Sequence, residues 1–549
     1  MTGRMRLGEF LVAYLRRVGV THLFGLPGDL VLGLFQSLAR ERELEIVTFS
    51  HEPAVGFAAD GYARATRRLG VICVTYGAGG NNIVNSIAAA YAERVPLLVI
   101  SGGPGEAEAR RSNIHHMVKS IDSQWRVLSE VTCDARILRE PSLAAREIHD
   151  LVCRVMRELR PGYLEIHRDL VELEIDVPED IVGWNGEIAG PFSDRRRLAE
   201  AQRDIAERLW LAHRPVLIAG VDLHRVGAHE DFLRLAEKLG CAVATTMLAK
   251  GVFPMDHPLH LGIQIGPFGA PAVQKRVAEA DLVLELGTQH TDINLGRASE
   301  IAPPERTIWA EPERVSVSFH QYPNVMLREL VRGLADAELP SFDEKVEYCD
   351  NLLRTPFEEN AGAPLSTNDF LVEVNEFLAQ HPGLYVVAES GDMLFGGLEL
   401  RLRGGMYMAQ GYYASMGFGV PAALGAQIGT GVRPLIVCGD GAFQMTGMEI
   451  SHALRLGQNP ICIVVNNSGW GIFRPITERQ DLLDVPAWPY AELGRALGGE
   501  GCRATTRAEL RAALAAAFDS PRFSIVEAVT PPDDLSPISR RYITSGAKR

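Results

Sequence analysis

The sequence lacks any apolar run long enough to cross a bilayer, and it lacks an excess of basic residues. Its 549 residues carry a formal net charge of −14 at pH 7. Binding to nucleic acid needs clustered Lys and Arg to neutralise phosphate, so this acidic balance argues against nucleic acid as a main partner. The absence of a membrane-length apolar run argues against a membrane-spanning helix and a membrane partner.

The N-terminus also lacks the features of a secretory signal peptide, because charged residues interrupt every apolar stretch there. Apolar residues instead recur at helical spacing between Leu7 and Val18, and Gly19 follows as a stop. We therefore predict an amphipathic helix that begins a folded domain. The eight cysteines are scattered, and none forms a CxxC pair. This pattern favours a reducing, cytoplasmic compartment.

Short apolar runs alternate with longer helical patterns along the whole chain. The composition is that of an ordinary globular protein, with 46% hydrophobic and 23% charged residues. Apolar runs separated by helices indicate parallel sheets in an α/β fold. The clearest runs are residues 71–76, 96–101, 216–220, 282–287, 384–388, 435–438 and 461–465. Polar stretches between blocks of such runs predict three domains, over residues 1–180, 190–345 and 365–549.

Two of the predicted strands lead into glycine-rich turns, at residues 77–80 and 439–441. Such turns bring backbone N–H groups close to a phosphate. Two common nucleotide motifs are not supported: Asn82 stands where a dinucleotide fingerprint needs glycine, and no GxxxxGK[ST] occurs. Each turn is followed by a helix and another strand. The first and third domains therefore resemble each other, which is compatible with duplication, although many α/β units share this order.

Asp440 and Asn467 follow two neighbouring predicted strands of the third domain. Because the carboxyl ends of parallel strands meet at one edge of a sheet, we expect these side chains to lie close together. A carboxylate and an amide oxygen suit Mg²⁺, which usually takes few protein ligands and several phosphate oxygens. A cofactor that combines Mg²⁺ with a diphosphate group fits this pattern.

The stretch from Gly439 to Asn467, GDGAFQMTGMEISHALRLGQNPICIVVNN, resembles the thiamine diphosphate-binding motif. Other segments agree with it: FGLPGD with Asp29, SHEPAVGFAADGYAR with Glu52, the histidine pair in residues 113–116, and GYYASMGFGVPAALGAQ. The chain is similar over nearly its whole length to the thiamine diphosphate-dependent 2-oxo acid decarboxylases, the group of pyruvate, indolepyruvate and phenylpyruvate decarboxylases. This resemblance implies a pyrimidine-binding domain, a central Rossmann-like domain and a diphosphate-binding domain, each with a parallel sheet.

The resemblance also implies how the cofactor is held. Mg²⁺ would be bound by Asp440, Asn467 and the carbonyl of Gly469. Glu52 would activate the cofactor through its pyrimidine ring; the alternative is that Glu52 only caps a helix, because Pro53 follows it as a good first helical residue. Met416 would wedge the two cofactor rings, and the Ala414 carbonyl would accept from the amino group. The remaining cofactor-binding candidates are Asp392, Gly439, Gly441 and Ala442.

Asp29, His115 and His116 are the implied proton relay, and histidine suits this task because its ordinary pKa is near neutral. Asp292 is a further catalytic candidate from the central domain. The implied reaction is the non-oxidative decarboxylation of a 2-oxo acid to an aldehyde and CO₂ through a thiamine diphosphate enamine. Family members join as a homodimer or homotetramer with active sites at the subunit interface. Glu52 would come from one chain and Asp440 from the other.

The sequence departs from the pyruvate decarboxylases at Phe473, where those enzymes carry a glutamate. A phenyl ring cannot transfer a proton or hydrogen-bond a carboxylate. We expect Ile472 and Phe473 to line a pocket for a bulky or aromatic substrate, such as indolepyruvate or phenylpyruvate. The alternative is a carboligase, an acyloin or acetolactate-type synthase, and the His115–His116 pair counts against it. A catalytically silent cofactor-binding protein is disfavoured because Glu52, Asp440 and Asn467 are all present.

Overall fold

The computed structural model describes residues 3–546, except 41–43, 112–113, 297, 299, 350, 355 and 403–405. Asn113, part of the histidine motif, lies outside the described residues. The chain divides into two compact units. The first contains Met1–Gly190, Val420–Gly431 and Thr446–Gln458, and the second contains the rest. The domain limits 1–180, 190–345 and 365–549 stay a prediction, because the contacts define two units and not three.

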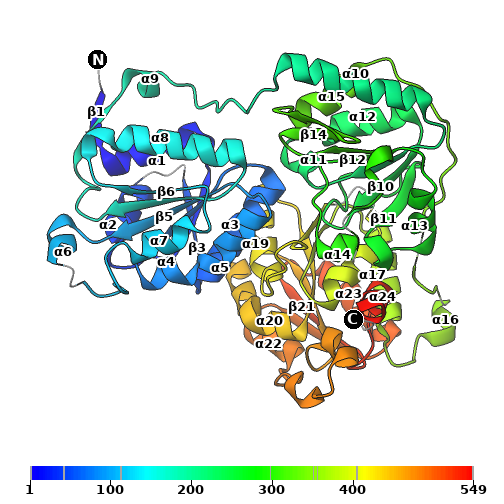
Figure 1. Ribbon diagram of the computed structural model, residues 1–549. Helices are drawn as coiled ribbons and strands as arrows, with labels where there is room; N and C mark the ends of the chain where they lie inside the picture. Colours follow the sequence, from blue (N-terminus) through cyan, green and yellow to red (C-terminus); the bar gives the residue numbers. More distant parts are fainter. Residues whose placement is uncertain are drawn as a thin grey trace. The chain divides into compact units, whose positions relative to one another are not determined.

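A six-stranded parallel sheet forms the centre of the first unit. Its strand order is β3-β2-β4-β5-β7-β6. In Figure 1, α1 and α8 lie on one face of this sheet, and α3, α4, α5 and α7 lie on the other. The bounds are β2 (His22–Gly25), β3 (Glu45–Thr48), β4 (Gly70–Val74), β5 (Leu97–Gly103), β6 (Asp134–Leu138), β7 (Gly162–His167), α1 (Leu7–Arg17), α3 (Glu52–Thr66), α4 (Ala78–Asn82), α5 (Val84–Ala92), α7 (Ser123–Ser129) and α8 (Pro141–Glu158).

Helix α1 confirms the amphipathic helix that the sequence predicts at the N-terminus. It buries Leu7, Phe10, Leu11, Tyr14 and Leu15 in the core of the first unit. Among the described helices, none combines the length and the apolarity that crossing a bilayer requires.

Helix α3 is packed closely against α19 (Gly419–Thr430) within the first unit. A Cβ atom at Gly425 would lie 1.9 Å from the Ala58 carbonyl oxygen, and one at Gly61 would lie 2.1 Å from the Ala422 carbonyl oxygen. Only glycine lets two backbones approach so closely. The contact holds the helix that begins at Glu52.

The central sheet, in the second unit, is mixed. Its order is β11-β10-β9-β12-β13-β14-β15, and its last two strands run antiparallel to their neighbours. The prediction of a parallel sheet in this domain is therefore wrong at one edge. Only residues 311–313 separate β13 from β14, whereas a parallel connection needs a crossover of a dozen or more residues. The strands are β9 (Val216–Ala219), β10 (Ala242–Thr246), β11 (His260–Gln264), β12 (Val283–Leu286), β13 (Thr307–Ala310), β14 (Arg314–Val317) and β15 (His320–Pro323).

Helices cover both faces of the central sheet, as the two-sided apolar character of β9 requires. Leu217 and Ala219 pack against α10 (Arg195–Leu211), α12 (His229–Leu239) and α15 (Leu327–Asp336). Val216 and Ile218 point to the opposite face and pack against α13 (Pro271–Ala278). This alternation is the two-residue period of a strand that is buried on both sides.

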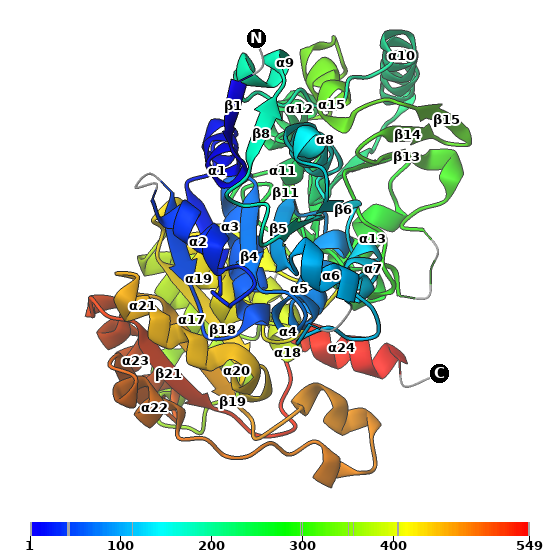
Figure 2. The same ribbon diagram turned by 90° about the vertical axis from the view of Figure 1, so that its left-hand side faces the viewer.

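The C-terminal sheet of the second unit is parallel, in the order β17-β16-β18-β19-β21-β20. Numbered by their position along the chain, its strands and those of the N-terminal sheet both read 2-1-3-4-6-5. The resemblance between the first and third blocks thus extends to the whole sheet. Helices α17 and α23 pack on one face, and Figure 2 shows α22 and α23 near β21. The bounds are β16 (Tyr385–Ala388), β17 (Tyr407–Ala409), β18 (Pro434–Gly439), β19 (Ile461–Asn466), β20 (Glu500–Ala504), β21 (Ser524–Val529), α17 (Thr367–Gln380), α22 (Tyr490–Ala496) and α23 (Arg507–Asp519).

Candidate active site

Asp440 and Asn467 lie at the same edge of the C-terminal sheet, as the spacing predicts. Strands β18 and β19 are parallel neighbours with Gly439 opposite Val465, so both residues follow directly after the ends of paired strands. One carboxylate oxygen of Asp440 accepts the Gly441 N–H at 2.7 Å, and the other accepts the Gly469 N–H at 3.0 Å. The loop after β19 therefore folds back onto the carboxylate.

The surroundings of Asp440 favour a bound cation. Burial raises the pKa of this carboxyl to about 6, although backbone N–H groups oppose the rise. In the part of the chain that the structure describes, no cationic side chain pairs with Asp440. A Cβ atom at Gly439, the residue before Asp440, would meet none of the described atoms within 4 Å. Carboxylate, amide and carbonyl oxygens together form a donor set that fits Mg²⁺.

The segment that carries Ala414 and Met416 has a constrained backbone. Ala414 adopts a left-handed conformation with φ of 56°, and Gly417 has φ of 86°. Non-glycine residues rarely adopt a positive φ, so neighbouring groups must hold the segment. Ser390 contributes by donating from its hydroxyl to the Ser415 carbonyl at 3.2 Å.

Glu389, which the sequence argument did not select, also holds this segment. It follows β16 and is buried, and its two oxygens accept N–H groups from Ser390 at 2.8 Å and from Gly419 at 2.6 Å. Burial raises the pKa of Glu389 to about 7, against the effect of the backbone N–H groups. The sequence does carry a signal for Glu389, because this acidic residue directly follows the apolar run at residues 384–388.

Asp392 is buried, but its described partners come from the C-terminal segment. It accepts the Ser536 hydroxyl at 2.7 Å and the Ser536 N–H at 3.2 Å, directly before α24 (Pro537–Gly546). Within α24, Tyr542 stacks on Phe395 with 5.0 Å between ring centroids. The contacts of Asp392 therefore anchor the C-terminal helix, and its predicted role in cofactor binding stays a prediction. Ala442 is buried in α20 (Asp440–Thr446), beside the Gly439–Gly441 turn.

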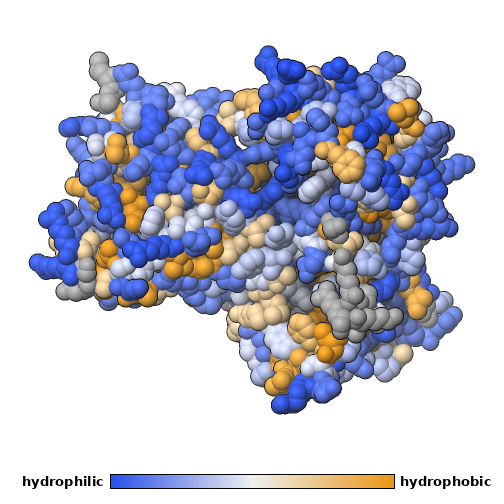
Figure 3. Space-filling view, in the orientation of Figure 1, coloured by the Kyte–Doolittle hydropathy of each residue, from blue (hydrophilic) through white to orange (hydrophobic). Residues whose placement is uncertain are grey.

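Ile472 and Phe473 lie in η5 (Gly471–Ile476) and have different environments. Ile472 packs into an apolar cluster that includes Ile293 of α14 (Asp292–Leu295), whereas Phe473 is 49% exposed. Asp292 is exposed at the beginning of α14. Asp292 therefore directly precedes Ile293, which packs against the same apolar cluster as Ile472. On the face shown in Figure 3, hydrophilic residues predominate and apolar ones form separate groups.

In the first unit, Glu52 is the first residue of α3, and Pro53 follows it. The N-cap is His51, so the alternative that Glu52 caps the helix is wrong by one residue. The Glu52 carboxylate faces the Gly-rich turn. The Asn82 side-chain amide donates to one carboxylate oxygen at 2.8 Å. A Cβ atom at Gly79 would lie 3.4 Å from the other oxygen.

Asp29, His115 and His116 lie together in the first unit. The His115 Nε2 atom lies 2.6 Å from one Asp29 carboxylate oxygen, and the His116 Nε2 atom lies 3.9 Å from the other. The two imidazole rings are 4.4 Å apart between centroids. Desolvation opposes the change, but the hydrogen bond and charge of His115 lower the pKa of Asp29 below its ordinary value. All three residues of the cluster are exposed.

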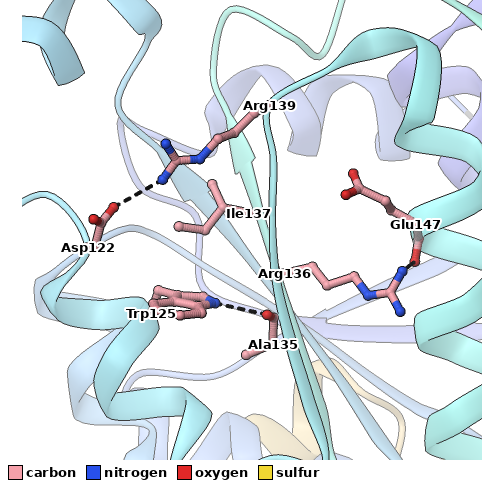
Figure 4. A pocket seen from close by; sticks show the side chains of 7 residues that line it. All are labelled: Asp122, Trp125, Ala135, Arg136, Ile137, Arg139 and Glu147. Carbon is pink, nitrogen blue, oxygen red and sulfur yellow. Dashed lines mark hydrogen bonds and ion pairs between the residues drawn. The ribbon is translucent and has the colours of Figure 1, made fainter.

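A cavity of about 350 Å³ opens beside the edge strand β6, outside this cluster. Figure 4 shows its ion pair, in which Arg139 contacts Asp122 at 3.2 Å, and the Arg136 side chain, which donates to the Glu147 carbonyl at 3.0 Å. None of the predicted site residues lines this cavity.

Comparison with known proteins agrees with the assembled groups. Three family models match: the N-terminal TPP binding domain of thiamine pyrophosphate enzymes over residues 5–124, the central domain over 202–332 and the C-terminal TPP binding domain over 396–528. An indole-3-pyruvate decarboxylase from Azospirillum brasilense is 37% identical over 99% of both chains. A probable pyruvate decarboxylase from Schizosaccharomyces pombe is 30% identical over 90% of this chain and 87% of its own.

A third relative is an alpha-keto-acid decarboxylase from Mycobacterium avium, which is 30% identical over 96% of this chain and 94% of its own length. The family models and the relatives cover the same three blocks that carry the glycine-rich turns, the paired histidines and the carboxylate–amide edge. The chain therefore belongs to the thiamine pyrophosphate enzyme family, among its 2-oxo acid decarboxylases.

Proposed function

We propose that the chain converts a bulky or aromatic 2-oxo acid, such as indolepyruvate or phenylpyruvate, to an aldehyde and CO₂ with thiamine diphosphate and Mg²⁺. The observation that carries the proposal is the assembled Asp29–His115–His116 cluster, which supplies groups for protonating the product. The similarity to an indole-3-pyruvate decarboxylase supports the aromatic substrate.

Asp440, Asn467 and the carbonyl of Gly469 would hold Mg²⁺ together with the diphosphate group. Thiamine diphosphate, when bound, supplies the electron sink that lets CO₂ leave a 2-oxo acid. The backbone at Gly439, Gly441 and Ala442 would line the diphosphate. The segment held by Glu389 would present the Ala414 carbonyl and the Met416 side chain to the cofactor rings.

Glu52 would hold a proton against the pyrimidine ring of the cofactor. The hydrogen bond from Asn82 fixes the orientation of one carboxylate oxygen and leaves the other beside Gly79. This fixed orientation would help Glu52 exchange a proton with the pyrimidine ring, because proton transfer requires the two atoms to lie within hydrogen-bond distance.

His115 and His116 would deliver the proton to the carbon that has lost CO₂. Because the His115 Nε2 atom donates to Asp29, its Nδ1 atom would be the one that gives and takes the proton. Asp292 is a further candidate in this role.

Phe473 and Ile472 would shape the side-chain pocket. Ile472 is anchored in an apolar cluster, and the exposed Phe473 offers an aromatic face to a phenyl or indole group. A glutamate at position 473 would place a charge against such a ring.

The active form would be a homodimer or homotetramer, with Glu52 from one subunit and Asp440 from another at each site. Ile476 and Leu482, which follow Phe473 in the chain, are also exposed apolar side chains. They support burial of this segment against a partner subunit. All eight cysteines are unbridged, which supports a cytoplasmic location.

The test follows CO₂ and aldehyde from pyruvate, branched-chain 2-oxo acids, phenylpyruvate and indole-3-pyruvate, with thiamine diphosphate and Mg²⁺ present. Equal amounts of CO₂ and aldehyde, with the highest kcat/KM on the aromatic acids, are expected. CO₂ with an acyloin or acetolactate-type product would instead identify a carboligase. A preference for pyruvate would remove the proposed role of Phe473.

A further inference from the structure

One glycine turn contacts both proton-handling groups of the first unit. A Cβ atom at Gly79 would lie 3.4 Å from a Glu52 carboxylate oxygen, and Asn82, at the end of the same turn, donates to the other oxygen. At the beginning of the turn, a Cβ atom at Gly77 would lie 2.2 Å from the carbonyl oxygen of His116. The backbone of His116 therefore rests directly on Gly77.

Both backbones at this contact have unusual conformations. Gly77 has φ of 70° and ψ of −92°, and His116 has φ of 69°. A histidine with positive φ is uncommon, and such a conformation persists only when its surroundings hold it. The Gly77 turn can hold the His116 backbone only if other contacts hold the turn in its own conformation.

A buried chain of hydrogen bonds fixes the turn from its other side. The Gln124 side-chain oxygen accepts the Gly77 N–H at 2.5 Å. The Gln124 amide nitrogen donates to the Ser101 hydroxyl at 2.8 Å and to the Tyr163 hydroxyl at 2.6 Å. Tyr163 in turn donates to the Glu165 carboxylate at 2.7 Å. All four side chains are buried.

The direction of this chain is set by its last member. The Glu165 carboxylate accepts, so the Tyr163 hydrogen is committed to it and the Tyr163 oxygen accepts from Gln124. The Gln124 amide nitrogen then points toward Tyr163, and the Gln124 oxygen points toward the Gly77 N–H. Without the acceptor at position 165, the Tyr163 hydroxyl could donate to Gln124, and a reversed amide would leave the Gly77 N–H without a partner.

We propose that Gln124, Tyr163 and Glu165 are positioning residues that fix the Gly77 turn and, through it, the His116 backbone and the face presented to Glu52. The inference rests on the proposed roles of His116 and Glu52 in the reaction. Burial raises the pKa of Glu165 to about 7, with Asp122 and Arg139 as the charged groups that act on it. Either form of the Glu165 carboxyl offers Tyr163 an acceptor oxygen.

The test compares Tyr163→Phe, Glu165→Leu and Glu165→Gln in the full-length protein. The Glu165→Gln variant keeps an acceptor oxygen for the Tyr163 hydroxyl, whereas Glu165→Leu and Tyr163→Phe each break the chain. Tyr14→Phe is the matched control, because Tyr14 is another buried tyrosine of the same unit whose hydroxyl contacts His149 at 3.1 Å. Hydrogen–deuterium exchange of residues 75–82 and 114–122 is measured before cofactor is added, and kcat and KM are measured after it is added.

Tyr163→Phe and Glu165→Leu are expected to accelerate exchange in both segments and to lower kcat by about ten- to a hundredfold, with a smaller change in KM. Glu165→Gln and Tyr14→Phe are expected to match the wild type in both measurements. Unchanged exchange in Tyr163→Phe would overturn the proposal, and so would faster exchange with an unchanged kcat. Equal losses in Glu165→Gln and Glu165→Leu would also overturn it.

The proposed function is tested separately by Glu52→Gln and His116→Ala. Full activity in both variants would refute the assigned catalytic roles, whatever the exchange measurements show. Loss of activity in these two variants, together with wild-type exchange in Tyr163→Phe, would keep the catalytic roles and refute the positioning chain alone.

Discussion

The Asn82 side-chain amide donates a hydrogen bond to the Glu52 carboxylate across 2.8 Å. Thirty positions along the chain separate the two residues, and the turn after β4 brings them together. We expect Asn82→Ala to lower kcat by about tenfold, because a hydrogen bond to a charged group contributes roughly 1.5–3 kcal/mol. Steady-state kinetics at saturating cofactor measure this effect. Asn82→Asp should lower kcat further, since a second carboxylate would repel Glu52; an unchanged kcat in Asn82→Asp would contradict the role of Asn82.

Asp29 should matter for activity far more than for stability. Its carboxylate is half exposed, and exposed ion pairs contribute little to folding. Asp29→Asn removes the charge that orients His115, so kcat should fall by about ten- to a hundredfold while the melting temperature stays nearly constant. Arg4 provides the control: Arg4→Ala breaks another exposed pair, with Asp176, and should leave kcat unchanged.

Glu389 should make stability depend on pH. Its folded-state pKa of about 7 is raised above the ordinary value, so the stability it contributes is present at low pH and is lost as the pH rises through 7. The loss is at most about 1.4 kcal/mol per pH unit. In Glu389→Gln this slope is absent. The stability difference between wild type and variant should therefore shrink from pH 5 to pH 8 in denaturant unfolding of the cofactor-free protein; a constant difference would contradict it.

A site shared between subunits predicts recovery of activity on mixing two inactive variants. Glu52→Gln and Asp440→Ala should each be inactive alone. After dissociation and random reassociation, half of the dimers would be mixed and each would contain one intact site, giving about a quarter of the wild-type activity. The specific activity of the mixture measures this. Recovery of nothing, with mixed dimers verified by mass, would place both residues of a site in one chain.

Phe473 should control the choice of substrate. Phe473→Ala is expected to lower kcat/KM for phenylpyruvate by about tenfold, because a missing aromatic contact and a cavity each weaken binding of the ring. The kcat/KM for pyruvate should change much less. Leu211→Ala is the control, since Leu211 is an exposed apolar side chain at the end of α10, outside the predicted site. Equal losses of kcat/KM for phenylpyruvate and pyruvate in Phe473→Ala would show that Phe473 stabilises the fold and does not select the substrate.

Local spacing predicted much of this site because parallel strands constrain where chain segments meet. Asp440 and Asn467 follow adjacent strands, so their shared edge could be deduced from two apolar runs and the polar residues after them. The amphipathic first helix followed in the same way from a 3.6-residue period. The apolar runs do not indicate the antiparallel edge of the central sheet, which follows from the short connection between β13 and β14.

The supporting groups could not be found from spacing. Glu389 and the Gln124–Tyr163–Glu165 chain act through contacts between segments that are distant in sequence, and polar residues inside apolar strands carry no periodic signal. Asp392 likewise has contacts that its motif does not indicate. Its place beside the cofactor stays a prediction, and the structure adds a hydrogen bond from Ser536, more than a hundred positions away.

The shared strand order of the N-terminal and C-terminal sheets has an evolutionary consequence. Position for position, the turn after the third strand carries Gly77 and the contacts to His116 in one sheet, and Asp440 in the other. Because each domain has its own copy of this turn, a substitution in one turn leaves the other turn unchanged. One copy could specialise in holding anions and metal while the other acquired proton chemistry, without either task constraining the other.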